Sequence, residues 1–454
     1  MPSLYEPFPG LPPFPDTVPT APLLKISLAK LLRHDKEEEQ RLWEVCCDLG
    51  FFYLDLRSDG PATNGHTDGT EGDTNEYANE HSNGTNGPTS DVQIDGESLL
   101  RDADQLFKVG EELFDLPVEE KQKYDFAEQG SYFGYKGYGS GIVDKKGTKD
   151  RNEFYNVCYL LSSFSPFASI FRVLDTNHSQ LDSRMSSAKP AANKSAKVSK
   201  DDILANMPPL PAPKLLEKHR PLLKSYITTS HSLITLILTH LNAHLALPPN
   251  TLQNLHNLHA ISGDQVRFIK APPQPPADRR TALGAHTDFG SVTVLFNRLG
   301  GLQVRLPSSI DAVPPATQPV GEERVEIEAL TVGDGEQRWA YVRPLPWHAI
   351  INLGDALVKF SKGILRSNVH RVVAPPGLQA EGTRFSLVYF SRPEDDAILK
   401  PLRESPLVKE RCGDAEGGEG VDSKTWILRR ALGRRMGGRW EDSAGTEDAR
   451  GIKG

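Results

Sequence analysis

The fold is decided by residues 283–296, which read Leu-Gly-Ala-His-Thr-Asp-Phe-Gly-Ser-Val-Thr-Val-Leu-Phe. This stretch places an imidazole, His286, two residues before a carboxylate, Asp288. Successive side chains on a strand point to opposite faces, so we expect both groups to project from one face of a short strand. The β-branched and aromatic residues at 292–296 are also typical of a strand. The pattern therefore predicts that the two polar groups lie at the edge of a packed sheet.

Two further motifs follow on strand-like sequence. His370 lies in Ser-Asn-Val-His-Arg-Val-Val, and Arg384 and Ser386 lie in Thr-Arg-Phe-Ser-Leu-Val-Tyr-Phe, again two residues apart. Two histidines and one carboxylate form the facial donor set that leaves other metal positions open, as in non-haem Fe(II) sites. A guanidinium beside a hydroxyl suits a carboxylate ligand. We therefore expect a metal site and a carboxylate site on one set of strands.

In these motifs and in their order, the chain resembles the 2-oxoglutarate/Fe(II)-dependent dioxygenase superfamily. The branch it resembles includes isopenicillin N synthase and the plant flavonoid and hormone oxygenases, and the organisation is similar to that of fungal members. The N-terminal third resembles the family through Gly-Phe-Phe-Tyr-Leu (50–54), Leu-Pro-Val-Glu-Glu-Lys (116–121) and Glu-Phe-Tyr-Asn (153–156). The resemblance covers residues 20–400, interrupted by insertions.

The resemblance implies a fold that is mainly β with helices, in which N-terminal and long central helices brace a double-stranded β-helix, or jelly-roll, core. It implies that His286, Asp288 and His370 hold Fe(2+) and that Arg384 and Ser386 bind the cosubstrate 2-oxoglutarate. O2 is the second cosubstrate, and ascorbate serves as an additional reductant. The implied activity is oxidation of a small organic molecule in secondary metabolism, by hydroxylation, desaturation or ring closure.

One departure from the family pattern keeps alternatives open. Many relatives carry Asn-x-Tyr before a Pro pair, but here Ile269 and Ala271 stand at those positions. Arg267 or Lys270 could supply charge near the site, and strand parity leaves open which of them points inward. The first alternative is an oxidase similar to isopenicillin N synthase that uses no 2-oxoglutarate. The second is a binding or sensing module that has lost catalysis.

Composition predicts four regions along the 454 residues. They are an N-terminal dioxygenase region (20–156, with an insert at 57–91), an insert at 176–206 followed by a bracing helix (within 157–260), the barrel (261–400, with an insert at 306–337) and a tail (401–454). The insert at 57–91 has almost no apolar residues, and we expect it to be disordered. It contains a second His-Thr-Asp at 66–68. No strand flanks that tripeptide, so we expect no metal there.

Charge and cysteine content limit the partners and the compartment. The net charge of −8 gives no reason to expect nucleic acid as a partner. The four cysteines form no spaced framework, which favours a reducing, cytoplasmic compartment. The most apolar segment, 226–247, contains three histidines and an asparagine, so we expect an amphipathic helix and no membrane span. We therefore expect a monomeric enzyme whose partner is a small-molecule substrate.

Overall fold

The structure is a computed structural model that describes residues 8, 10–58, 94–158, 210–275, 279–317, 338–413, 420–434 and 445–446. The inserts expected at 57–91, 176–206 and 306–337 fall wholly or mainly outside these ranges, and so does the second His-Thr-Asp at 66–68.

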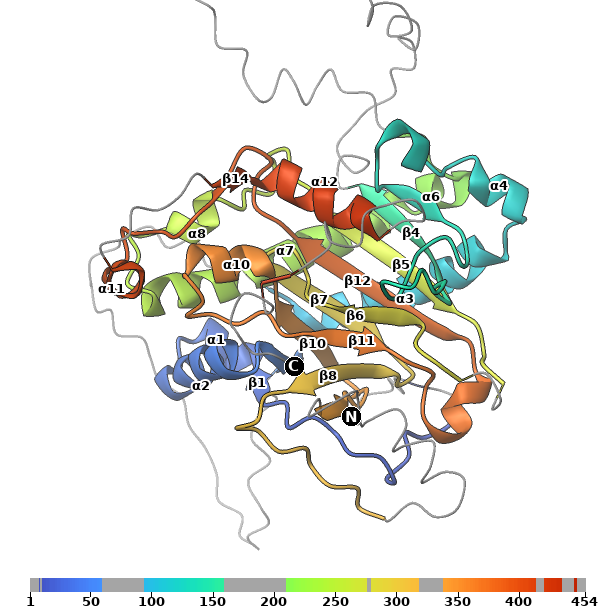
Figure 1. Cartoon of the computed structure of the whole chain (residues 1–454), viewed down its shortest axis with the longest axis horizontal. Helices are drawn as coiled ribbons and strands as arrows, with labels where there is room; N and C mark the ends of the chain where they lie inside the picture. The colour runs from blue at the N-terminus through green and yellow to red at the C-terminus, as the bar shows by residue number, and fades with distance from the viewer. Residues whose placement is uncertain are drawn as a thin grey trace, which may run out of the picture.

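Two sheets, one in front of the other in Figure 1, form the centre of the molecule. The larger sheet has eight strands in the order β1-β2-β10-β7-β12-β5-β4-β3, and the smaller has four in the order β6-β11-β8-β9. All neighbours in these two sheets are antiparallel except β1 and β2. This arrangement confirms the expected jelly-roll architecture.

The larger sheet consists of β1 (Lys25–Ser27), β2 (Phe51–Asp55), β3 (Gly134–Lys136), β4 (Glu153–Cys158), β5 (Gln265–Ala271), β7 (Val292–Asn297), β10 (His348–Leu353) and β12 (Arg384–Ser391). The smaller sheet consists of β6 (Leu283–His286), β8 (Leu302–Leu306), β9 (Arg338–Tyr341) and β11 (His370–Val372). A separate pair is formed by β13 (Ile398–Leu399) and β14 (Val421–Asp422).

Helices surround the sheets. They are α1 (Leu28–Leu32), α2 (Lys36–Asp48), α3 (Gly96–Asp115), α4 (Val118–Gln122), α6 (Lys214–Lys218), α7 (Arg220–His244), α8 (Thr251–Asn254), α10 (Asp355–Phe360), α11 (Pro406–Cys412) and α12 (Ser423–Gly433), with 3-10 turns η1 (Ala127–Gln129) and η4 (Gly377–Glu381). The long helix α7 carries Pro221 in its first turn, where no intrahelical hydrogen bond from its backbone nitrogen is needed. None of the described helices is long and apolar enough to cross a membrane.

Helices α3 and α7 contact each other, and both contact β12 of the larger sheet. The α3 helix begins at Asp95, whose side chain accepts a hydrogen bond from the Ser98 N–H, and its apolar residues recur at helical spacing. It approaches the sheet closely, since a Cβ at Gly110 would lie 3.0 Å from the Phe268 ring. Alternation along β12 leaves the other sheet face, with Arg384 and Ser386, toward the smaller sheet. The helices thus cover one face and leave the inner one for the site.

Candidate active site

The three predicted metal-ligating residues come together between the sheets. Strands β6 and β11 pair so that His286 lies directly opposite His370, with ring centroids 4.2 Å apart. The Oδ1 atom of Asp288 lies 3.9 Å from His286 Nε2 and 3.8 Å from His370 Nε2. One ligand atom from each residue falls within 4.8 Å of the others, a spacing that a metal ion can bridge. In one detail the expectation was wrong: β6 ends at His286, so Asp288 lies in the segment that crosses to the larger sheet.

Backbone carbonyls orient both imidazoles. His286 Nδ1 lies 2.8 Å from the Gly284 carbonyl, and His370 Nδ1 lies 3.2 Å from the Asn368 carbonyl. Because a carbonyl only accepts, each Nδ1 carries the proton and each Nε2 presents a lone pair toward Asp288. Burial holds the pKa of His286 well below its usual value, so this ring is neutral at physiological pH. Neutral imidazoles with free Nε2 atoms are the form that binds a metal.

Asp288 is held by one of its two oxygens. Its Oδ2 accepts hydrogen bonds from Thr293 Oγ1 at 2.6 Å and Asn352 Nδ2 at 2.7 Å, which leaves Oδ1 toward the imidazoles. Burial alone would raise the pKa of Asp288, but the two histidines and these two hydrogen bonds bring it below its ordinary value. The carboxylate is therefore ionised, and the donor set fits a divalent metal ion of the Fe(II) type.

The segment that carries the ligands is fixed from outside by α12. Side chains spaced four residues apart on this helix donate to carbonyls spaced two residues apart on 285–289. The bonds run from Trp426 Nε1 to Phe289 O (3.1 Å), from Arg430 Nη2 to Thr287 O (3.1 Å) and from Arg434 Nη2 to Ala285 O (3.0 Å). Because β6 is an edge strand, these donors take the place of a neighbouring strand. The sequence pattern of the 401–454 tail gave no sign of this role.

The N-terminus of α10 fixes the same segment from a second side. The Asp355 N–H donates to the Asp288 carbonyl at 2.8 Å. The Asp355 side chain is fully buried and accepts from Arg430 Nη1 at 2.5 Å and from Thr287 Oγ1 at 2.9 Å. A Cβ at Gly354 would lie 2.2 Å from the Gly290 carbonyl, so only glycine allows this close approach.

An inner cavity of about 510 Å³ lies between the sheets, with the three metal-ligating residues, Arg384 and Ser386 in its lining. Arg384 is buried, and it donates from Nε to the Gly300 carbonyl at 2.7 Å and from Nη1 to Ser386 Oγ at 2.7 Å. Burial lowers the pKa of Arg384 to about 10, and no acidic group among the described residues counteracts that shift. A buried guanidinium needs an anion, so this end of the cavity fits the far carboxylate of 2-oxoglutarate.

The structure also shows which of the two basic side chains of β5, Arg267 or Lys270, points toward the site. Arg267 lines the inner cavity together with Ile269, whereas Lys270 points the other way, with Nζ 3.8 Å from Asp115 Oδ1 and 3.9 Å from Glu153 Oε1. An arginine therefore lies on the same strand face as the isoleucine that stands in the place of the family's Asn-x-Tyr asparagine.

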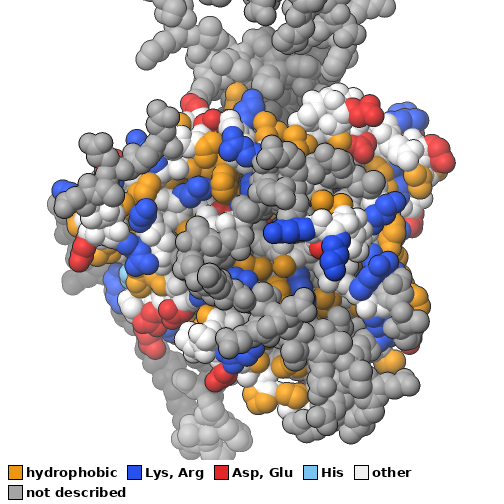
Figure 2. Space-filling model, in the orientation of Figure 1, with side chains coloured by type: hydrophobic (Ala, Val, Ile, Leu, Met, Phe, Trp, Pro, Cys, Tyr) orange, Lys and Arg blue, Asp and Glu red, His pale blue; other side chains and the backbone are white. Residues whose placement is uncertain are grey.

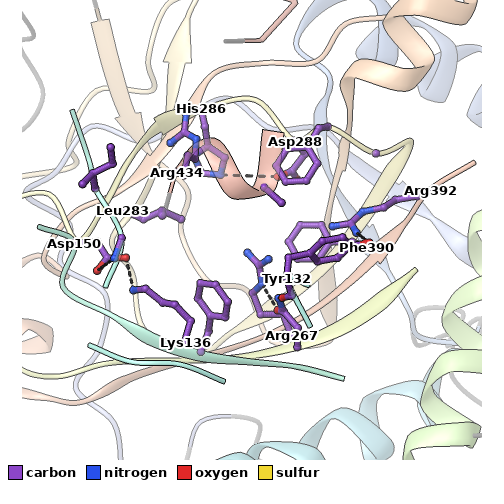
Figure 3. A pocket seen from close by; sticks show the side chains of 17 residues that line it. Tyr132, Lys136, Asp150, Arg267, Leu283, His286, Asp288, Phe390, Arg392 and Arg434 are labelled. Carbon is purple, nitrogen blue, oxygen red and sulfur yellow. Dashed lines mark hydrogen bonds and ion pairs between the residues drawn. The ribbon is translucent and has the colours of Figure 1, made fainter. Parts of the chain in front are cut away.

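An outer cavity of about 780 Å³ meets the inner one at His286, Asp288 and Arg267 (Figure 3). Tyr132 lines this cavity. Tyr135 is buried, with its hydroxyl 2.6 Å from Glu153 Oε2, and Tyr138 is about half exposed.

A second His-Glu-His group, formed by His34, Glu39 and His240, also lies within ligating distance. Here Glu39 Oε2 already accepts a hydrogen bond from Lys36 Nζ at 2.7 Å, so a cation occupies the carboxylate. His240 is buried on α7, as expected for a packed helical histidine. None of these three residues lines either cavity, and this group is the weaker metal candidate.

Comparisons with known proteins agree with this geometry. Residues 93–174 match the model of the N-terminal region of non-haem dioxygenases in morphine synthesis, and residues 320–393 match that of the 2OG-Fe(II) oxygenase superfamily. The chain is 28% identical to a 2-oxoglutarate-dependent dioxygenase of Aspergillus fumigatus, over 87% of this chain and 81% of the relative. It is 26% identical to another from a Dothideomycetidae species, over 90% of each chain.

Among solved structures, the fold is similar to that of a full-length Neurospora crassa protein in complex with alpha-KG, with a TM-score of 0.55 and 16% identity over 90% of this chain and 95% of that one. These matches support placing the chain in the 2-oxoglutarate/Fe(II)-dependent oxygenase superfamily. It is an oxidoreductase that uses Fe(II), 2-oxoglutarate and O2, and this favours the main interpretation over the oxidase alternative.

Proposed function

We propose that this protein oxidises a small organic molecule of secondary metabolism, with Fe(II) held by His286, Asp288 and His370. The observation that carries the proposal is the convergence of two carbonyl-oriented imidazoles on one carboxylate oxygen at 3.8 and 3.9 Å. Arg384 and Ser386 bind the far carboxylate of 2-oxoglutarate. This assignment is supported because Arg384 has no acidic partner among the described residues. The fungal relatives named as 2-oxoglutarate-dependent dioxygenases support the same activity.

When bound, Fe(II) would activate O2, which is the oxidant: one oxygen atom would be used to convert 2-oxoglutarate to succinate and CO2, and the other would be available to oxidise the substrate C–H bond. The protein itself orients the metal-ligating groups and excludes water from the cosubstrate. Thr293 and Asn352 fix which oxygen of Asp288 faces the metal. Ile269, Leu295 and Val388 line the inner cavity with apolar surface that excludes water around the cosubstrate. The outer cavity, which shares His286 and Asp288, holds the C–H bond to be oxidised.

The proposal keeps the predicted division of the chain, with residues 261–400 as the oxygenase barrel and 20–156 as its N-terminal region. The five candidate site residues all fall within 261–400, in support of that boundary. We also propose that the protein acts as a cytoplasmic monomer on a small molecule, with no nucleic acid or membrane partner. The net charge of −8 supports the first of these exclusions.

An anaerobic titration tests the metal and cosubstrate residues together. Fe(II) is added to purified protein, followed by 2-oxoglutarate, and the weak visible charge-transfer band of the chelated cosubstrate is recorded. We expect the band with the unchanged protein and its loss in His370→Ala. We expect Arg384→Ala to keep Fe(II) binding but to weaken 2-oxoglutarate binding about 10- to 100-fold, because a charge-assisted pair of hydrogen bonds is lost.

The exposed histidine of the second group provides the matched control. His34→Ala should leave Fe(II) binding and the band unchanged, since His34 lies outside both cavities. Loss of the band in His34→Ala, or its persistence in His370→Ala, would refute the assignment of the metal ligands. Normal 2-oxoglutarate affinity in Arg384→Ala would refute the assignment of the carboxylate site.

A further inference from the structure

The outer cavity carries a surplus of positive charge. Its described lining contains four cationic side chains and two carboxylates, which are Lys136, Arg267, Arg392, Arg434, Asp150 and Asp288. Lys136 and Asp150 form a buried ion pair, so their charges cancel. Asp288 belongs to the proposed metal ligands. The other cationic side chains of this lining are three arginines, and Figure 2 shows Lys and Arg side chains distributed over the face turned toward the viewer.

Arg434 and Arg267 lie on different sides of the cavity, as Figure 3 shows. Arg434, beside His286, is fixed by its bond from Nη2 to the Ala285 carbonyl. Burial lowers its pKa to about 10, so it stays protonated at neutral pH. Arg267 comes from β5 and is fixed through its Nε, which donates to Asn156 Oδ1 at 2.7 Å. Each guanidinium is thus anchored through the neutral oxygen of a neighbour.

Aromatic rings form another part of the lining. The Arg267 guanidinium lies 4.3 Å from the Phe154 ring centroid and 4.9 Å from that of Phe390. Arg392 closes the wall, donating from Nη1 to the Gly263 carbonyl at 2.6 Å and to the Tyr132 hydroxyl at 2.8 Å. Rings that pack beside fixed cations form a surface for a molecule with one apolar end and one anionic end.

We propose that the substrate of this enzyme bears a carboxylate and an apolar body, and that Arg434 and Arg267 bind the carboxylate while the aromatic wall contacts the body. This inference rests on the proposed function, because it assigns the outer cavity to the substrate. Arginine forms strong, directional pairs with carboxylates, and a cavity lined by one sign of charge concentrates ligands of the other sign.

A different arginine serves the cosubstrate, so the two anions do not compete. Arg384 lines only the inner of the two cavities, and Arg434 only the outer. Arg267 lies where the cavities meet. A substrate carboxylate at Arg434 would therefore lie close to His286 and leave Arg384 to 2-oxoglutarate.

Calorimetry on the anaerobic protein with Fe(II) and saturating 2-oxoglutarate tests this proposal. The probes are phenylacetate, 3-phenylpropionate and 4-phenylbutyrate, each paired with its neutral amide. We expect at least one acid to bind about ten times more tightly than its amide, through charge-assisted hydrogen bonds. Arg434→Met should abolish this preference, whereas Arg429→Met, an exposed arginine on the same helix, should retain it.

Equal binding of acid and amide for all three pairs would overturn the proposal, and so would a preference that survives both Arg434→Met and Arg267→Met. The charge-transfer band with 2-oxoglutarate, recorded on the same samples, reports the proposed function separately. A missing band in the unchanged protein refutes the cosubstrate assignment, whatever the probes show. A normal band without acid preference refutes the anionic subsite alone.

Discussion

Arg430→Met tests whether α12 holds the metal-binding segment in place. Arg430 is 2% exposed and Asp355 is fully buried, with 2.5 Å between Nη1 and Oδ2. Removing one partner of a buried ion pair leaves an uncompensated charge and costs about 3–5 kcal/mol. Asp355 would retain hydrogen bonds from Thr287 at 2.9 Å and Thr446 at 2.6 Å. We therefore expect a loss at the low end, about 3 kcal/mol of unfolding free energy.

The assay is urea unfolding followed by fluorescence, together with Fe(II) titration. Since Thr287 lies between His286 and Asp288, we expect Fe(II) affinity to fall about 10- to 100-fold, as for other groups that orient metal ligands. Arg429→Met, on the exposed face of α12, should change stability by less than about 0.5 kcal/mol. Adding Asp355→Asn to Arg430→Met should recover part of the loss, because the buried charge is then gone. Equal stability of the two arginine variants would refute the reasoning.

Two further predictions concern the surroundings of the same segment. Gly354→Ala should cost about 1–3 kcal/mol and weaken Fe(II) binding, because the new Cβ would lie 2.2 Å from the Gly290 carbonyl. Gly382→Ala, where the nearest atom is a Leu299 methyl at 3.1 Å, is the control in the same unfolding assay, and an equal cost would contradict the clash. Burial lowers the pKa of His256 from 6.5 to about 4. Below pH 6.5 the unfolded chain therefore binds a proton that the folded chain does not. We expect on the order of 3 kcal/mol of unfolding free energy to be lost between pH 6.5 and 4. His256→Gln should show a shallower loss of urea midpoint between pH 7 and 5, and an unchanged slope would mean that other groups cause it.

The local chemistry of the site could be predicted from the sequence because it depends on short-range pattern. Arg384 and Ser386 share a face of β12 and touch at 2.7 Å, as their spacing of two requires. His370 lies on a strand, as its apolar neighbours predicted. The prediction that Asp288 lies on the same strand as His286 was wrong, because the chain leaves β6 after His286 and crosses to the larger sheet. The path of this crossing depends on hydrogen bonds to the N-terminus of α10, which is distant in the sequence.

The side of β5 from which Arg267 projects could not be predicted from the sequence, for a different reason. Strand parity relates residues to one another but does not say which face of β5 is inside. The register of β5 with β12, which pairs Ile269 with Ser386, fixes that choice, and it is set by partners more than 100 residues away. An arginine thus enters the site near the positions where the family pattern has a neutral hydrogen-bonding pair, and this change favours an anionic ligand beside the metal.

Helix α12 and the residue that follows it contact both the metal-binding segment and the outer cavity. Their donors at 426, 430 and 434 face one direction, because residues four apart share a helix face. Two of them only support the segment that carries His286 and Asp288, while the third, Arg434, also lines the outer cavity. A substrate carboxylate bound by Arg434 would therefore act on the same helix that orients the metal ligands. Substrate binding and ordering of the metal-binding segment should then strengthen each other, since a ligand that favours the docked helix also favours the ligand geometry.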